Sequence, residues 1–395
     1  MSRFKAARFA LWTAIAVCLC AAPARSELAS LDDKELLRQL FSGQSLDAGW
    51  FAPDFADRVP LSHVHHVVDG IREERGVVPR VSGSSGRYYI ATGIRRVPVT
   101  LHRDQQGRIV ALAFHPALPT QSDLASVAME VQALPGQVSV LITKDGEALA
   151  SSRAGERLGV ASAVRLAVLA TLKQEIEAGR ARWEESVQLE ERHRSLPPGE
   201  MRKLPEAAPA TLHALAVAMM AAADNTATDI LIDRLGRDAV ATTAGMELLA
   251  TTRERFQLIA DRALYQDYVQ AGLSGRRALL KGLESRPLPH PAQLLRPLPG
   301  QAEWSMSAEQ LCALMDGVLG LDVMRIEPGP ADPERWVRVG HIAGRGAGVL
   351  SLTTSMTAPR SGRFCVSITW NDRAVLDEAR LYDLYVRLLA VLPRR

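Results

Sequence analysis

The chain has little net charge, few cysteines and no visible internal repeat. Its formal net charge is +3 over 395 residues, and charges of both signs are mixed throughout the sequence. This balance favours no polyanionic partner, so we expect no binding of nucleic acid. The 47% of hydrophobic residues is enough for two domains with cores of their own, and a single domain of this length would be unusual.

Residues 1–26 have the pattern of a secretory signal peptide. A basic beginning precedes an apolar run over 9–22, and small residues follow before residue 27. The run is too short for a helix that spans a membrane. Cys18 and Cys20 are each preceded by a residue bulkier than a lipid-attachment site normally accepts. We therefore expect cleavage and a soluble protein that is periplasmic or secreted, with no attachment to the membrane.

Cys312 and Cys365 are then the remaining cysteines of the mature chain. In an oxidising compartment a disulfide between them could persist. Cys312 lies in a helical pattern and Cys365 in a strand pattern, so the sequence alone does not fix their separation. One bridge and two buried thiols are both compatible with this pattern.

Residues 27–121 form the first predicted domain, a small α+β domain. Apolar spacing and composition predict helices and strands at 31–41, 61–71, 87–91, 97–103 and 108–115, with a hairpin turn at 104–107. His63, His65 and His66 lie on the second helix. Residues two apart on a helix point to different faces, and no nearby cysteine or carboxylate pair completes a metal site. We expect no metal and no other cofactor.

Residues 122–395 form the second predicted domain, after a short linker with prolines. Helices are expected at 123–134, 162–179, 211–223, 225–235 and 375–392, and two more begin with capping boxes after Thr251 and Ser307. Strands are expected at 137–143, 148–152, 336–343, 348–356 and 363–371. The order is a helix, two strands, a helical insert, three strands and a final helix.

The stretch 159–179 predicts a largely buried helix with Ser162 in its first turn. Apolar residues recur through its first half, polar residues gather in its second half, and Gly179 stands where the helix should end. At a first turn, free N–H groups and the helix dipole favour negative charge on or beside the hydroxyl. Taken alone, this stretch favours Ser162 as a simple N-cap.

Two later segments change that interpretation. The segment 222–229 contains Asp224-Asn225, and the segment 339–350 is rich in glycine. With Ser162 they follow in the order and spacing of three active-site motifs, Ser-x-x-Lys, Ser-Asp-Asn and Lys-Thr/Ser-Gly. On these residues the chain resembles the class A β-lactamases and penicillin-binding serine hydrolases.

The resemblance implies an α+β fold for 122–395, with an antiparallel five-stranded sheet, flanking helices and an all-helical insert. Within the family the chain resembles a subgroup that includes β-lactamase-like proteins of clavulanic acid biosynthesis. The similar segments are 162–169, 182–183, 196–199, 224–229, 249–254 and 346–350. Members of this subgroup carry a small isomerase-like domain first, so the resemblance implies a cystatin fold for 27–121.

Three active-site positions depart from the family pattern. Arg165 and Ile342 stand where the family has lysines, and Ala223 stands where it has a serine. A guanidinium stays protonated at any ordinary pH, so Arg165 can polarise or bind an anion but cannot accept the proton of Ser162. Glu247 is the only glutamate near the place where class A enzymes carry the one that activates water.

Other parts of the family's site are retained. The resemblance gives the oxyanion-hole positions to the backbone N–H groups of Ser162 and Arg345. It also makes Asn225 a ligand for a substrate amide. Arg345 and Arg165 bring two positive charges to the neighbourhood where the family's carboxylate anchor is missing. His341 is no substitute base, because strand alternation places it on the face opposite residue 342.

Two hypotheses about function follow. In the first, the chain is a weak or inactive relative that binds a peptidoglycan-derived, β-lactam-like or ester ligand in the family's cleft. In the second, it is an active serine hydrolase, a β-lactamase, peptidase or esterase that uses Ser162 with an unorthodox base. The joint change at Arg165, Ala223 and Ile342 favours the first hypothesis, because all three positions belong to one proton-transfer network.

Overall fold

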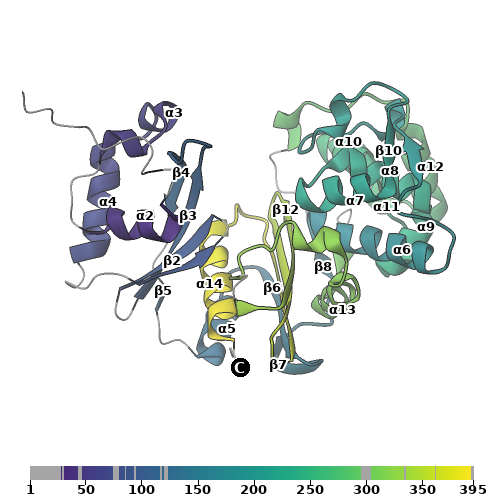
Figure 1. Ribbon diagram of the computed structural model, residues 1–395. Helices are drawn as coiled ribbons and strands as arrows, with labels where there is room; N and C mark the ends of the chain where they lie inside the picture. The colour runs from purple at the N-terminus through teal and green to yellow at the C-terminus, as the bar shows by residue number, and fades with distance from the viewer. Residues whose placement is uncertain are drawn as a thin grey trace, which may run out of the picture.

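The structure is a computed structural model that describes residues 28, 31–42, 47–73, 80–84, 86–92, 95–115, 118–119, 123–294, 304–332, 335–360 and 362–392. The predicted signal peptide, 1–26, lies outside the described residues. Two antiparallel sheets and a group of helices organise the chain (Figure 1). No described helix is long and apolar enough to cross a bilayer.

The N-terminal sheet carries three helices on one side. The helices are α2 (Asp33–Leu40), α3 (Pro53–Ala56) and α4 (Leu61–Glu73), preceded and joined by short turns that include η1 (Ala48–Trp50). The strands β1 (Arg80–Ser84), β2 (Arg87–Thr92), β3 (Arg95–Arg103) and β4 (Ile109–Phe114) pair in that order, and β5 (Leu118–Pro119) pairs with β3. Leu36, Ile90 and Leu101 are almost fully buried in the core between them.

The expected helices and strands of this region are present, and β1 is an additional strand. Its sequence, Arg-Val-Ser-Gly-Ser, has one large apolar residue and no alternation. It becomes a strand because its backbone pairs with β2 from Arg80↔Ala91 to Ser84↔Arg87, a tertiary contact that overrides weak propensity. The cystatin fold remains a prediction.

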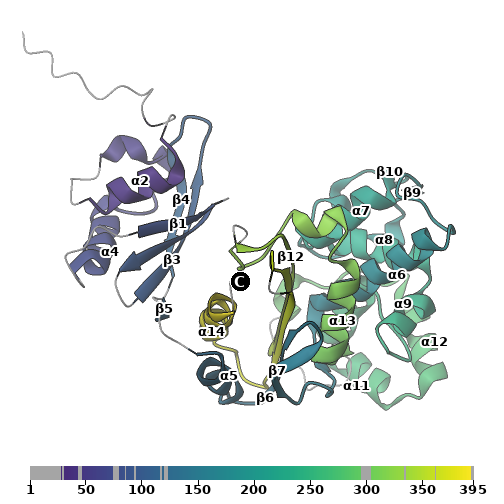
Figure 2. The same ribbon diagram turned by 60° about the horizontal axis from the view of Figure 1, so that its bottom comes forward.

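The central sheet has five strands in the order β12-β13-β14-β6-β7, all antiparallel. The strands are β6 (Gln137–Lys144), β7 (Glu147–Ser152), β12 (Arg338–Gly346), β13 (Val349–Thr357) and β14 (Arg363–Asn371). The helices α5 (Leu124–Gln132) and α14 (Glu378–Val391) cover one face, and α13 (Ala308–Val318) lies on the other (Figure 2). This arrangement confirms the predicted α+β fold.

The helical insert lies beyond α13. It contains α6 (Arg165–Glu177), α7 (Leu212–Ala221), α8 (Asn225–Leu235), α9 (Arg237–Thr243), α10 (Thr252–Ala260), α11 (Arg262–Gln270) and α12 (Leu273–Leu283). The apolar spacing does not predict α9, α11 or α12. Two short strand pairs accompany these helices, β8 (Leu158–Gly159) with β11 (Ser305–Met306) and β9 (Ser186–Gln188) with β10 (Pro209–Thr211). The short 3-10 turns of this part of the chain begin with η2 (Ala161–Val164) and end with η6 (Asp322–Arg325).

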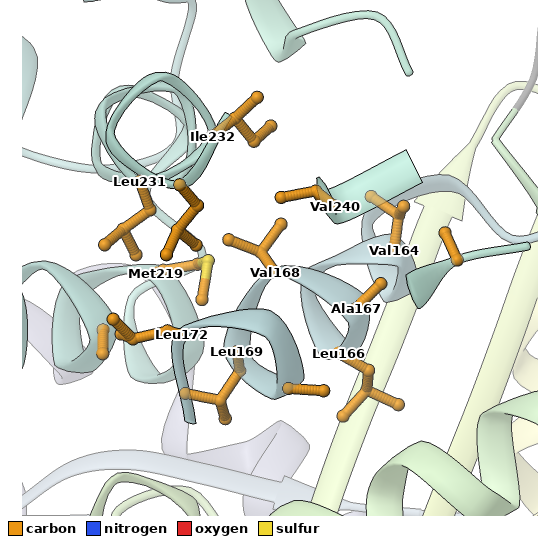
Figure 3. Packing of buried hydrophobic residues seen from close by; sticks show 14 of the residues in the cluster. Val164, Leu166, Ala167, Val168, Leu169, Leu172, Met219, Leu231, Ile232 and Val240 are labelled. Atoms are coloured by element: carbon orange, nitrogen blue, oxygen red, sulfur yellow. The ribbon is translucent and has the colours of Figure 1, made fainter. Parts of the chain in front are cut away.

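The helix α6 is the centre of the insert. Every residue from Arg165 to Leu172 is buried, so the helix has no solvent-facing side in its first two turns. Figure 3 shows Val168 and Leu172 of α6 beside Leu231 of α8 and Met219 of α7. Because neighbours surround α6 on all sides, the position of the Ser162 turn is fixed by core packing.

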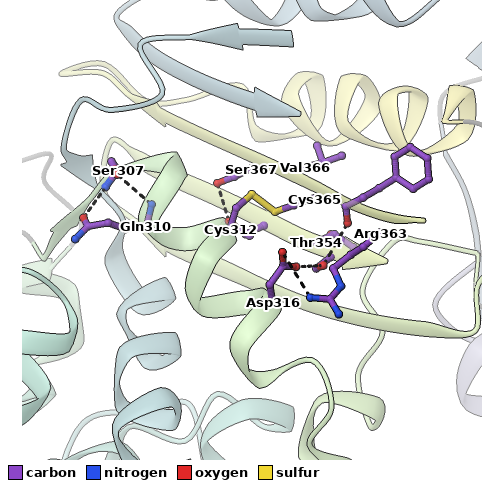
Figure 4. Close-up of a disulfide and its surroundings, with 12 residues drawn as sticks. Ser307, Gln310, Cys312, Asp316, Thr354, Arg363, Cys365, Val366 and Ser367 are labelled. Carbon is purple, nitrogen blue, oxygen red and sulfur yellow. Dashed lines mark hydrogen bonds and ion pairs between the residues drawn. A yellow bond between two sulfur atoms is a disulfide. The ribbon is translucent and has the colours of Figure 1, made fainter. Parts of the chain in front are cut away.

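A disulfide joins α13 to the central sheet. Cys312 and Cys365 are bonded, with their Cα atoms 5.9 Å apart and a sequence separation of 53 (Figure 4). Of the two alternatives that the sequence leaves open, the structure has the bridge. Both capping boxes, at Thr251 and at Ser307, are also present, and the second begins the helix that carries Cys312.

We expect removal of this bridge by Cys312→Ala with Cys365→Ala to lower the unfolding free energy by about 2–4 kcal/mol, because the unfolded chain regains entropy. Urea unfolding with and without a reductant measures the effect. The reductant should destabilise the native chain and leave the double variant unchanged. An equal midpoint for the native chain in both conditions would contradict the stabilising role of the bridge.

Candidate active site

Ser162 lies in a short turn, η2, between β8 and α6. The backbone of Ala161, just before it, has a φ of 44°. Neither η2 nor α6 has a side-chain cap, so the N-cap interpretation of Ser162 is wrong. The first turn is a 3-10 turn that α6 continues, and the serine therefore sits inside the helical run. Its half-buried hydroxyl makes no hydrogen bond to any other described residue.

Arg165 lies three residues after Ser162, at the position of the family's lysine. Its side chain is buried, with 5% of the residue exposed. Nε donates to Oγ1 of Thr228 at 3.2 Å, and Nη2 donates to Oδ1 of Asn225 at 2.7 Å and to the carbonyl of Ala223 at 2.8 Å. Burial lowers the pKa of Arg165 to about 10, which leaves it charged at neutral pH. Arg165 is therefore a hydrogen-bond donor here and not a base.

Asn225 connects Arg165 to the loop that contains Leu196 and Pro197. Its Nδ2 donates to the carbonyl oxygens of Leu196 at 2.8 Å and Pro197 at 3.2 Å. Only 4% of Asn225 is exposed. The structure thus joins Arg165 directly to Asn225, and it also shows that the Asn225 amide already has partners within the chain.

Asp224 holds the second motif in place. Its Oδ1 accepts the N–H of Ala227 at 2.9 Å and caps α8, and its Oδ2 accepts the N–H of Met201 at 2.8 Å. Ala223, just before it, has a φ of 54°, which is uncommon for a residue with a side chain. The hydrogen bonds of Asp224 hold the backbone of this motif in place, although Ala223 offers no hydroxyl.

The strand β12 touches the serine turn through a glycine. A Cβ on Gly344 would lie 1.9 Å from the carbonyl oxygen of Val160 and 2.6 Å from the amide nitrogen of Ala163. No other residue type fits at this contact. Ile342, two residues earlier on the same face, is packed into the core cluster around α6. The third motif therefore lies beside the first, but Ile342 presents hydrocarbon at the position of the family's cationic anchor.

The side chain of Arg345 lies on the other face of β12. Its guanidinium stacks over the ring of Tyr382, 5.0 Å from the centroid, and Nε is 3.4 Å from Oε2 of Glu378. Strand alternation separates this side chain from Ile342 and Gly344. The positive charge of Arg345 is thus directed to α14, and only its backbone belongs to the face that meets Ser162. Its N–H as an oxyanion donor stays a prediction.

The sequence model of the β-lactamase enzyme family matches residues 119–318, which is more than half of the chain. The chain belongs to this family. A β-lactamase from Sphaerobacter thermophilus DSM 20745 is 20% identical, with a TM-score of 0.49, and the match covers 68% of this chain and 95% of that one.

Two further solved structures are similar. A β-lactamase from Xanthomonas campestris pv. campestris ATCC 33913 is 16% identical, with a TM-score of 0.47 and coverage of 68% of this chain and 96% of that one. PBP-A is 14% identical, with a TM-score of 0.47 and coverage of 69% and 97%. A search of curated proteins found no match.

A buried polar network behind the family's motifs was not predicted. Asp229 accepts the N–H groups of Thr252 at 2.6 Å and Arg253 at 2.9 Å, and Oγ1 of Thr252 lies 2.6 Å from Oγ of Ser195. Burial raises the pKa of Asp229 to about 7. The available signal was the group of polar residues Asn225, Thr226, Thr228 and Asp229 in the first turns of α8, all of them buried. This network fixes the start of α10 against α8.

Glu247 is exposed. The buried glutamate of this region is Glu254, which caps α10 and pairs with Arg237 at 2.7 Å.

Arg255 follows Glu254 in sequence. Its guanidinium stacks over Trp304, 5.0 Å from the ring centroid, and a Cβ on Gly346 would lie 3.5 Å from its Nη2. Arg255 is a second buried cation close to the serine turn, and the motif comparison gave no signal for it.

Within the described ranges, no three histidine, cysteine, aspartate or glutamate side chains are grouped to hold a metal. Two cavities, of about 530 and 450 Å³, are lined by residues of other segments, the first by Trp183, His213 and Asp322 and the second by Gln257 and His290 among others. Neither cavity includes Ser162.

His341 lies on the face of β12 opposite Ile342, as alternation predicts. Its Nδ1 is 2.8 Å from Oγ1 of Thr354, its ring is near that of Tyr385, and the backbone of Gly329 closes over it. Burial, with a smaller effect of the charge on Arg87, lowers the pKa of His341 to about 3 from its ordinary value near 6.5. His341 is therefore a neutral structural residue.

We expect His341 to make the fold less stable in acid. The unfolded chain binds a proton on this histidine below pH 6.5 and the folded chain does not, so stability falls as the pH drops from 6.5 toward 3, by at most about 1.4 kcal/mol per pH unit. Unfolding free energies of His341→Gln should show a smaller pH slope over this range. The exposed His66→Gln is the control and should keep the native slope; equal slopes in all three proteins would contradict this assignment.

Proposed function

We propose that the chain binds a β-lactam-like or peptidoglycan-derived ligand at the Ser162 site and turns it over slowly or not at all. The observation that carries this proposal is the position of Arg165. A permanently charged donor, held by three hydrogen bonds, occupies the place of the family's base. Acylation of a serine needs a group that can take its proton, and Arg165 cannot do so.

The surrounding residues support slow or absent turnover. Ala223 has no hydroxyl to pass a proton to the leaving group, and Ile342 offers no charge to a substrate carboxylate. Asp229 has a pKa near neutrality, but both of its oxygens already accept backbone N–H groups, so it makes no contact with Ser162. The alternative, an active hydrolase with an unorthodox base, has no such base in hydrogen-bond contact with Ser162 among the described residues.

We further propose that the mature protein is exported and soluble, with a first domain at 27–121 and a second at 122–395. The separate cores of the two sheets support this division, and the family match begins at residue 119. The disulfide between Cys312 and Cys365 supports an oxidising compartment.

We expect acylation of the native chain by nitrocefin or a fluorescent penicillin to be near background and almost unchanged in Ser162→Ala, because no neutral base is in contact with the serine. Intact-protein mass spectrometry counts the adduct, and ligand-observed NMR measures binding without acylation. Rapid labelling that disappears in Ser162→Ala would show instead that the second hypothesis, an active hydrolase, is correct.

Restoring one member of the proton-transfer network should return little activity, because such members act as a unit. We expect Arg165→Lys alone to stay near background in β-lactam acylation. The triple change Arg165→Lys, Ala223→Ser and Ile342→Lys should give measurable acylation of Ser162, since it supplies an amine, a hydroxyl relay and a cation for the substrate carboxylate. Full turnover by Arg165→Lys alone would show that Ala223 is not part of the deficit.

A further inference from the structure

We propose that Arg165 binds a carboxylate of the ligand directly beside Ser162, so that the site holds a carboxylic acid where an active relative would hold the carbonyl that it attacks. This inference rests on the proposed function, because it assumes that the ligand enters at Ser162. The recognised group is a carboxylate, and the residue that recognises it is Arg165.

The first observation is a buried charge without a counter-charge in contact. Within the described part of the chain, Arg165 forms no ion pair, and its three hydrogen bonds go to a hydroxyl, an amide oxygen and a backbone carbonyl. The charges of Asp224 and Asp229 act on it, but each carboxylate is bound by backbone N–H groups. Buried charges are normally paired, so the guanidinium is suited to an anion from outside.

The second observation is that Arg165 has hydrogen-bond donors that no described residue uses. A guanidinium has five N–H groups, and the three bonds of Arg165 use Nε and Nη2. Nη1 has no hydrogen-bond partner among the residues that the structure describes. The Ser162 hydroxyl is likewise unengaged and lies three residues earlier on the same helical run, hence on the same side. These groups are donors, and a carboxylate is the acceptor that satisfies two or three donors at once.

The third observation is that two other cations near this site, Arg345 and Arg255, already have partners. Arg345 is directed to Glu378 and Tyr382 on the far face of β12. Arg255 stacks over Trp304 and has further partners. Ile342 removes the cation that the family's third motif would supply. Arg165 is therefore a buried cation at the serine turn with donors that no described residue uses.

The ligand class follows from this placement. A carboxylate at Ser162 is what remains after a β-lactam ring has been hydrolysed, and it is also the free end of a peptide. An intact lactam or an ester places a neutral carbonyl there, which leaves the charge of Arg165 unpaired. The site should therefore prefer acids that resemble hydrolysis products over the corresponding intact or esterified compounds.

A matched pair of ligands tests this preference on the native chain. Benzylpenicilloate carries the carboxylate formed by ring opening, and its α-methyl ester differs only in having that group neutralised. By isothermal titration calorimetry we expect the acid to bind at least about tenfold more tightly than the ester, the effect of a charged hydrogen bond. Benzylpenicillin should resemble the ester.

Two variants locate the effect. Arg165→Gln should reduce the ratio between acid and ester to near one, and circular dichroism checks that it folds. Arg338→Gln removes a positive charge from the exposed start of β12, away from the serine turn, and should keep the native ratio.

Equal binding of acid and ester by the native chain would overturn the inference and leave the proposed function standing. Absence of binding by all three compounds would overturn the proposed function and the inference with it. A preference for the acid that persists in Arg165→Gln would show that another group binds the carboxylate, and it would also refute the inference.

Discussion

The buried guanidinium of Arg165 holds together the parts of the site that come from different segments. One side chain bonds Thr228 and Asn225 of α8 and the carbonyl of Ala223 before it, and Asn225 passes the connection on to Leu196 and Pro197. A lysine has a single nitrogen and could not make this planar set of contacts. Arg165 therefore holds α6, the start of α8 and the loop with Leu196 and Pro197 in one hydrogen-bonded arrangement.

The other half of the site depends on a contact that only a glycine permits. Gly344 brings β12 against the carbonyl of Val160 and the amide of Ala163, and α6, buried all round, holds these residues from behind. The serine turn is thus fixed between a strand and a core helix. Because these constraints are backbone and core contacts, they position the serine turn independently of the reactivity of Ser162.

The two faces of β12 carry residues that pack against different parts of the molecule. Ile342 and Gly344 face the insert, and His341 and Arg345 face α14. Alternation along a strand is a local rule, so the sequence predicted correctly that His341 lies away from Ile342. The same rule also directs the Arg345 side chain away from Ser162. The sequence analysis expected the positive charge of Arg345 near the carboxylate anchor, and the structure directs that charge to Glu378 and Tyr382 of α14 instead.

The sequence by itself determined the order of a helix, two strands, a helical insert, three strands and a final helix, the five strands of the central sheet, and the capping boxes at Thr251 and Ser307, because periodicity and caps are local signals. Only the tertiary structure decided that β1 is a strand, that Cys312 and Cys365 are bridged, that Ser162 caps no helix, and that Asp229 organises a buried network. Each of these depends on which distant backbone or side chain lies within a few ångströms, and that separation is fixed by packing and not by neighbours in sequence.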